Sequence, residues 1–148
     1  MVSCNKTGIY NVYEITIADG TETQITNSEK ETFFALDYVP GTGQILYSAD
    51  KGGNENNHIY LIKDDSTTID LTPGETEKAS FGGWSKDKNY MYYISNKRDP
   101  KFMDLYKMKI EDWTAEMIYQ NDDGLNIAGM SDDENYYALS RTVTTSEN

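Results

Sequence analysis

The sequence predicts an all-β protein, a partial β-propeller of about three four-stranded antiparallel blades. Three observations lead to this prediction. The sequence repeats at intervals of about 46 residues. Each repeat holds four short runs rich in Tyr, Ile, Val and Thr, and Gly, Asn, Asp or Pro separate these runs. No window shows the sustained i, i+3, i+4 apolar spacing of a helix.

The repeat is clearest in three segments that begin at residues 11, 58 and 104: "NVYEITIADGTETQIT", "HIYLIKDDSTTIDLT" and "DLYKMKIEDWTAEMI". Between them lie Tyr-rich segments that end in Ser48, Ser95 and Ser140, and Ser3 marks the end of one more such segment. We therefore expect a single propeller fragment, 1–148, with repeats at 3–48, 49–95 and 96–140 and the start of a further blade at 141–148.

Each blade is expected to contain four strand types, named a to d from one edge of its sheet to the other. Type a is expected at 33–38, 80–84 and 126–130, and type b at 44–48, 90–95 and 136–140. Type c is expected at 12–17, 59–63 and 105–110, and type d at 23–26, 68–72 and 115–119. "IADGTE" and "IKDDST" predict tight c–d turns. The Gly-rich a strands suit the innermost position, where blades converge. A solenoid is the competing architecture, although its coils are usually shorter and less rich in Tyr.

The strand order along the chain leaves a broken blade at each end. Propellers usually need four to eight blades to close. Either the chain is part of a larger propeller, or two chains complete a six-bladed ring. In both cases open blade edges favour self-association.

Composition excludes several classes of partner and site. The chain has 25 acidic and 13 basic residues, a net charge of −12, which disfavours nucleic acid and membrane surfaces as partners. The single cysteine, Cys4, permits no intrachain disulfide and no Cys-rich zinc site. No apolar run approaches the roughly 18 residues of a membrane helix, and no signal peptide is recognised. The compartment stays open, with the bacterial cytoplasm and the periplasm both compatible.

Short motifs in the repeats resemble the TolB-type, or PD40, repeat. That repeat has an aromatic-Ser-Pro-Asp-Gly-Lys turn, a strand ending in Ser-Asn-Arg, and then Asp-Ile-Tyr. Here the corresponding segments are "WSKDK" from residue 84, "SNKR" from 95 and "DLY" from 104. The turn departs from the pattern, because Lys86 replaces Pro and Lys88 replaces Gly.

Longer segments resemble the N-terminal propeller of bacterial prolyl-oligopeptidase-type serine peptidases, family S9, which includes dipeptidyl- and acylaminoacyl-peptidase relatives. The segments are "SADKGGNENNHIYLI", "DLTPGETEKASFGGWS", "NKRDPKFMDLYKM" and "IYQNDDGLNIAGMSDD", in this order. The resemblance covers essentially the whole chain. It implies a propeller that packs over an α/β-hydrolase domain and admits peptides but not folded proteins, and a parent protein that is a serine peptidase.

The chain itself is expected to be non-catalytic. It has no Gly-x-Ser-x-Gly nucleophile elbow, and a lone histidine, His58, supports no credible Ser-His-Asp triad. His58 aligns with Asn11 and Asp104, just before strand c, so we interpret it as a pattern position. "NDDGLN" and "SDDEN" suggest calcium, but these residues are also ordinary turn formers. We expect no cofactor and no metal.

The predicted recognition surface is formed by the long polar b–c loops together with the d–a loops. Long loops on a rigid scaffold usually carry recognition. The candidate residues for contact with a peptide substrate or partner domain are Asn54, Glu55, Arg98, Asp99 and Arg141. The two arginines suit a substrate carboxylate or an acidic partner patch, and ordinary surface ion pairs are the alternative.

Two other functions are compatible with the fold. One is a free-standing TolB-like module that binds a protein partner. The other is an enzyme with a metal in the propeller channel, as in sugar-lyase relatives. That function requires His and acidic residues on the a strands, where the sequence offers mainly Asp37 and Asn126.

Overall fold

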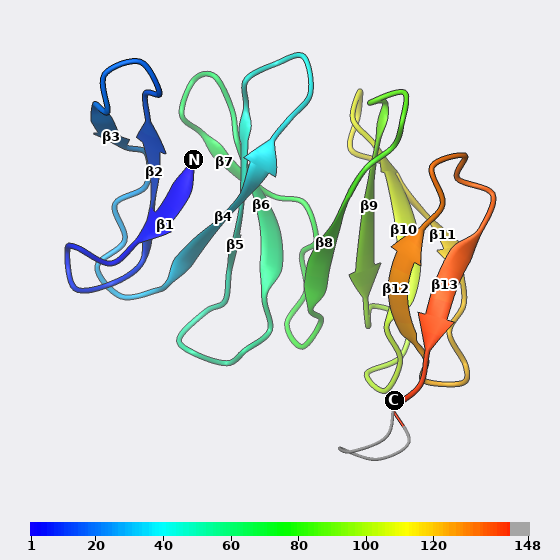
Figure 1. The fold of residues 1–148 in the computed structure, drawn as a ribbon. Helices are drawn as coiled ribbons and strands as arrows, with labels where there is room; N and C mark the ends of the chain where they lie inside the picture. Colours follow the sequence, from blue (N-terminus) through cyan, green and yellow to red (C-terminus); the bar gives the residue numbers. More distant parts are fainter. Residues whose placement is uncertain (143–148) are drawn as a thin grey trace. The chain divides into compact units, whose positions relative to one another are not determined.

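The computed structural model describes residues 1–142 and contains thirteen β-strands in four antiparallel sheets (Figure 1). The chain divides into two compact units, Met1–Lys78 and Ala79–Asn148, which are described separately. No helix of the described part is long and apolar enough to cross a membrane.

The first unit holds a three-stranded and a four-stranded sheet. The former consists of β1 (Val2–Cys4), β2 (Asn11–Ile15) and β3 (Glu22–Gln24), which correspond to strand types b, c and d. The latter runs in the order a, b, c, d: β4 (Phe33–Tyr38), β5 (Ile45–Ala49), β6 (His58–Ile62) and β7 (Thr68–Asp70).

The second unit also holds one four-stranded sheet and one incomplete sheet. Its four-stranded sheet contains β8 (Ala79–Trp84), β9 (Tyr90–Ser95), β10 (Asp104–Lys109) and β11 (Ala115–Tyr119). The strands β12 (Asn126–Met130) and β13 (Tyr137–Ser140) form a two-stranded sheet of types a and b. The prediction of an all-β partial propeller is therefore confirmed. Residues 143–148, within the predicted start of a further blade at 141–148, lie outside the described residues.

Every a strand carries a β-bulge at the same repeat position. The register against strand b shifts between Ala35 and Asp37 in β4. The equivalent shifts lie between Phe81 and Gly83 in β8 and between Ile127 and Gly129 in β12, again about 46 residues apart. A bulge bends a strand and increases its local twist. Each a strand therefore bends at the equivalent position of its repeat.

The a–b turns of the second unit share one hydrogen-bonding scheme. Ser85 Oγ donates to Asp87 Oδ1 at 2.7 Å and accepts from the Tyr90 N–H at 2.9 Å. Ser131 Oγ likewise donates to Asp133 Oδ1 at 2.6 Å and accepts from the Tyr136 N–H at 3.0 Å. In both turns the residue after the aspartate has a left-handed backbone conformation. These residues are Lys88, with φ of 62°, and Glu134, with φ of 59°.

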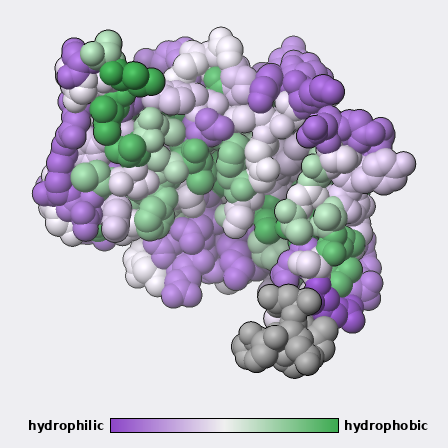
Figure 2. Space-filling view, in the orientation of Figure 1, coloured by the Kyte–Doolittle hydropathy of each residue, from purple (hydrophilic) through white to green (hydrophobic). Residues whose placement is uncertain are grey.

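Tyrosines form much of the core of both units. In the first unit the Tyr47 ring packs between Phe33 and Tyr60, with centroid separations of 4.8 and 5.1 Å, beside buried Val12 and Ile45. In the second, Tyr93 stacks on Tyr106 at 5.1 Å, among other buried residues of β9 and β10: Met91, Leu105 and Met108. Figure 2 shows hydrophilic residues over much of the visible face, in keeping with the net charge of −12.

Candidate functional site

The b–c and d–a loops meet at the first residue of each c strand. These residues are Asn11 in β2, His58 in β6 and Asp104 in β10, and all three are buried. The alignment placed them just before strand c, whereas the structure starts each strand at them. The strands begin one residue earlier than expected because each polar side chain is satisfied by the adjoining loop and can therefore be buried.

In the first repeat Asn11 closes the d–a loop with three hydrogen bonds. Its Nδ2 donates to the Ser28 carbonyl at 3.0 Å. Its Oδ1 accepts from the Ser28 N–H at 2.7 Å and from the Thr26 hydroxyl at 3.0 Å. The Asn11 amide thus holds the loop onto the start of β2.

In the second repeat His58 has the same role. Its Nδ1 lies 2.7 Å from the Asp70 carboxylate at the end of β7, and its Nε2 lies 3.2 Å from the Glu77 carbonyl. Both ring nitrogens therefore face oxygen atoms that belong to the d strand and the d–a loop of its own blade. His58 is the first residue of strand c, with structural partners on both sides of its ring.

In the third repeat Asp104 is the centre of a charged network. Arg98 donates to its two carboxylate oxygens, from Nε to Oδ2 at 2.7 Å and from Nη2 to Oδ1 at 3.0 Å. The Asn121 N–H donates to Oδ1 at 2.7 Å, and Arg98 Nη2 also lies 3.1 Å from Asp122. The hydrogen bonds from Arg98 hold the pKa of the Asp104 carboxyl below its ordinary value, although burial opposes this shift.

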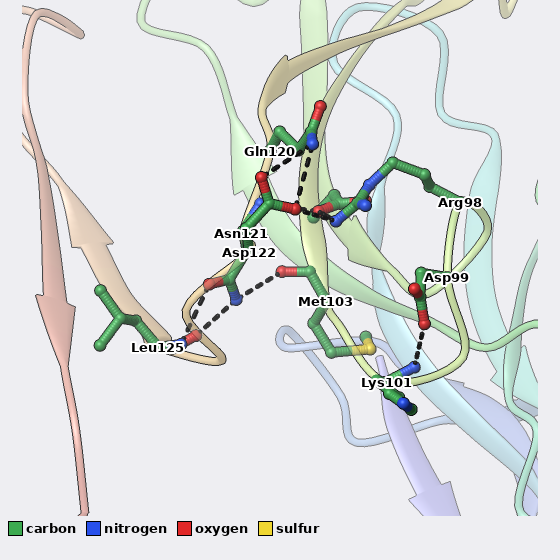
Figure 3. Close-up of polar contacts among 9 residues, drawn as sticks. Arg98, Asp99, Lys101, Met103, Gln120, Asn121, Asp122 and Leu125 are labelled. Atoms are coloured by element: carbon green, nitrogen blue, oxygen red, sulfur yellow. Dashed lines mark hydrogen bonds and ion pairs between the residues drawn. The ribbon is translucent and has the colours of Figure 1, made fainter.

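The neighbouring Asn121 ties the b–c loop to the d–a loop. Its buried side chain donates from Nδ2 to the carbonyls of Met103, at 3.1 Å, and Leu125, at 2.7 Å. Its Oδ1 accepts from the Leu125 N–H at 3.0 Å (Figure 3). Both loops of this blade are thus fixed by buried polar contacts.

Two of the predicted contact residues, Arg98 and Arg141, contact the d–a loop at 120–125, and a third, Asp99, follows Arg98 in the b–c loop. Arg98 pairs with Asp104 and Asp122, and Asp99 Oδ1 accepts from the Lys101 N–H at 2.9 Å. Arg141 Nη2 lies 3.4 Å from the Asp123 carbonyl. Arg98 therefore forms ion pairs within its own chain, which was the alternative to partner contact. Contact of Arg98, Asp99 and Arg141 with a partner stays a prediction.

The other two predicted residues, Asn54 and Glu55, lie in the b–c loop of the first unit. Asn54 Oδ1 accepts from the Asn56 N–H at 3.0 Å, and the Glu55 N–H donates to Asp50 at 2.7 Å. Both side chains are exposed. These two residues belong to the first unit, whereas Arg98, Asp99 and Arg141 belong to the second.

Sequence reasoning missed Asp104, Asn121 and Asp122 as members of this site. The alignment of Asp104 with Asn11 and His58 was the available signal for a shared buried position. Asn121 and Asp122 belong to "NDDGLN", which looked like a turn or a calcium loop. In the structure the Asp122 carboxylate instead accepts from Gln120 and pairs with Arg98, and residues 1–142 hold no cluster of three or more His, Cys, Asp or Glu side chains arranged for a metal.

Comparison with known proteins identifies the family. Residues 12–146 match the family model of the dipeptidyl peptidase IV (DPP IV) N-terminal region. The chain belongs to this family. No curated protein matches the chain.

Solved structures show the fold that this DPP IV N-terminal region shares. TolB from Acinetobacter baumannii superposes with a TM-score of 0.64 at 16% identity, over 93% of this chain and 33% of the TolB chain. A prolyl endopeptidase superposes with a TM-score of 0.62 at 13% identity, over 84% of this chain and 19% of the peptidase chain. The chain thus spans about a third of TolB and about a fifth of the endopeptidase. At these identities the likeness establishes a TolB-like propeller fold.

Proposed function

We propose that this chain is the non-catalytic propeller segment of an S9-type serine peptidase, where it gates peptide access to an α/β-hydrolase domain and contacts that domain. The observation that carries the proposal is the family match over residues 12–146. The nucleophile of the parent peptidase would lie in a Gly-x-Ser-x-Gly elbow outside this chain.

The face formed by the b–c and d–a loops is the proposed contact surface. Asn11, His58 and Asp104 each anchor a d–a loop to its own blade, which supports ordered loops within each unit. Within this face Arg141 is better disposed than Arg98 to bind a partner carboxylate. Its guanidinium makes one long contact with a carbonyl, whereas that of Arg98 already pairs with two carboxylates.

The first test is the reading frame of the parent gene. The proposal expects a hydrolase domain with a Gly-x-Ser-x-Gly elbow to follow this region. A frame that ends shortly after this chain would overturn the peptidase assignment. It would favour the alternative, a free-standing TolB-like interaction module, for which an upstream signal sequence is expected.

The second test uses the full-length parent and a matched pair of charge reversals. Arg141→Glu reverses a charge on the proposed contact face. Lys63→Glu also replaces a positive with a negative charge, but in a c–d turn, at the opposite end of a blade from the b–c loops. We expect Arg141→Glu to change kcat/KM for short peptides, and Lys63→Glu to leave it within about twofold of the wild type. Equal effects of the two variants on kcat/KM would contradict gating by the face that the b–c and d–a loops form.

Self-association through open blade edges belongs to the same proposal. Among the described strands β13 pairs only with β12, and β1 pairs only with β2. The side chain of Leu139 in β13 is 37% exposed. Light scattering of the chain should give a mass above that of a monomer, and Leu139→Lys should lower it because charge on an edge strand opposes pairing. A wild-type chain that stays monomeric with well-defined structure would contradict this part of the proposal.

A further inference from the structure

A small pocket with both polar and apolar lining residues lies beside the charged network in the second unit. Its volume is about 310 Å³, at the lower end of the range of roughly 300–1,000 Å³ for ligand pockets. It opens between the end of β9, the b–c loop, the d–a loop and the start of β12. The residues that line it are Ile94, Lys101, Met103, Asn121, Gly124, Leu125, Asn126 and Ile127.

The walls of this pocket are held in place by Asn121. The Asn121 side chain is buried and makes three hydrogen bonds, all to the backbone of Met103 and Leu125 (Figure 3). The side chains of those two residues form part of the apolar lining. The pocket is therefore shaped by internal contacts, and a ligand would not have to order it.

The charge at the pocket comes from Lys101. No acidic residue lines the pocket, and the Lys101 ammonium makes no hydrogen bond or ion pair with residues 1–142. The nearby Arg98 is balanced by Asp104 and Asp122. A cation without an ion-pair partner beside the apolar side chains of the pocket favours an anionic ligand group with an apolar neighbour.

We propose that this pocket binds the carboxy-terminal residue of a peptide. An apolar side chain enters the space between Met103, Leu125 and Ile127, and the terminal carboxylate pairs with Lys101. The exposed Asn126 amide, at the first position of β12, is placed to hydrogen-bond the peptide backbone. This inference rests on the proposed function and gives it a substrate class, peptides with an apolar carboxy-terminal residue. The binding itself requires no hydrolase domain.

The test compares three blocked dipeptides bound to the chain, followed by NMR titration and calorimetry. They are acetyl-Gly-Leu as the free acid, acetyl-Gly-Leu amide, and acetyl-Gly-Gly as the free acid. We expect the Leu acid to bind about three- to fivefold more tightly than the Leu amide, the range of an exposed ion pair. The Gly acid should bind more weakly than either, since it cannot fill the apolar space. Shifts should centre on Lys101, Gly124 and Asn126.

Two lysines of the same loop provide the matched control. Lys101→Ala should abolish the preference for acid over amide. Lys97→Ala removes the same charge from an exposed side chain that does not line the pocket, and should keep the preference. Met103→Ala should weaken both Leu ligands and leave their ratio unchanged.

Three outcomes would overturn the inference: no binding of the Leu acid, equal binding of acid and amide, or equal effects of Lys97→Ala and Lys101→Ala. None of these outcomes bears on whether a hydrolase domain follows the chain. Conversely, a parent gene without such a domain would overturn the peptidase assignment and leave a positive binding result intact.

Discussion

At the scale of single residues, Lys88 shows how this chain departs from the TolB-type turn. The turn has Gly at this position, and the structure gives Lys88 a left-handed backbone with φ of 62°. Lys88→Gly should raise the free energy of unfolding by about 0.5–1 kcal/mol, because the left-handed cost of an L-residue exceeds the entropic cost of Gly. Thermal unfolding would measure it.

The neighbouring Lys86→Gly is the control for this change. Lys86 is exposed and has an ordinary backbone, so the same substitution should not stabilise the fold. An equal rise in Tm for both variants would point to the loss of charge and not to relief of backbone strain.

Asp104 predicts a specific dependence of stability on pH. Its pKa is held below its ordinary value in the folded chain, so its ionised form stabilises the fold above the unfolded pKa of about 3.9. This contribution is lost as the pH falls through the lower folded pKa. Asp104→Asn should therefore lower the free energy of unfolding by about 2 kcal/mol at pH 7, with the difference from the wild type narrowing below about pH 4.

Chemical denaturation at pH 3 to 7 would measure this difference. Asp123→Asn removes another carboxyl group from the adjacent loop, where Asp123 is exposed. It should change the stability by less than about 0.5 kcal/mol. If Asp104→Asn and the wild type differed in free energy of unfolding by the same amount at pH 3 and at pH 7, a stabilising role of the ionised Asp104 carboxylate would be contradicted.

Residues of the candidate site were predictable only in part. Arg98, Asp99 and Arg141 were found because arginines and long polar loops stand out in an acidic chain. Asn121 was not found, because an Asn beside Asp and Gly is an ordinary turn former. Its burial depends on the backbone of Met103, which is distant in sequence and is brought to it by the pairing of β10 with β11.

At the scale of elements, the bulges of the a strands predict opposite effects for two equivalent glycines. Gly83 and Gly129 follow the bulges of β8 and β12. Gly83 has φ of 116°, a conformation that side chains rarely adopt, whereas Gly129 has no positive φ and open space around its Cβ position. Gly83→Ala should destabilise the fold by at least about 1 kcal/mol, and Gly129→Ala should be neutral or stabilise it by up to about 1 kcal/mol.

Unfolding of both variants in urea would measure this contrast, with each compared to the wild type. Because the chemical change is identical, the difference isolates the backbone conformation. A loss of stability for Gly129→Ala as large as that for Gly83→Ala would show that both bulges need the freedom of glycine.

The ends of the d strands illustrate what strand patterns miss. The runs at 23–26 and 68–72 predicted longer strands than β3 and β7. In the structure the hydroxyls of Thr26 and Thr72 accept from the N–H groups of Val12 and Ile59, at 2.8 and 2.9 Å. A side chain thus replaces a backbone acceptor of the sheet, a substitution that alternation of apolar and polar residues does not reveal.

At the scale of the whole molecule, the net charge of −12 predicts stabilisation by salt. Repulsion among the excess carboxylates opposes the compact state, and salt screens it. Screening also weakens exposed pairs such as Arg98 with Asp122, but each such pair contributes little. Raising NaCl from about 0.01 to 0.15 M at pH 7 should therefore raise Tm. A Tm that falls over this range would show that attractive pairs outweigh the repulsion.

The sequence alone was sufficient for the all-β class, the repeat and the family. These properties depend on periodic patterns, since one blade must pack on the next and every repeat needs the same apolar spacing and the same turns. Only the tertiary structure showed the bulges, the burial of the first residues of the c strands, and the pocket beside Lys101. Each of these depends on backbone pairings and contacts between distant segments, which a pattern in one segment does not encode.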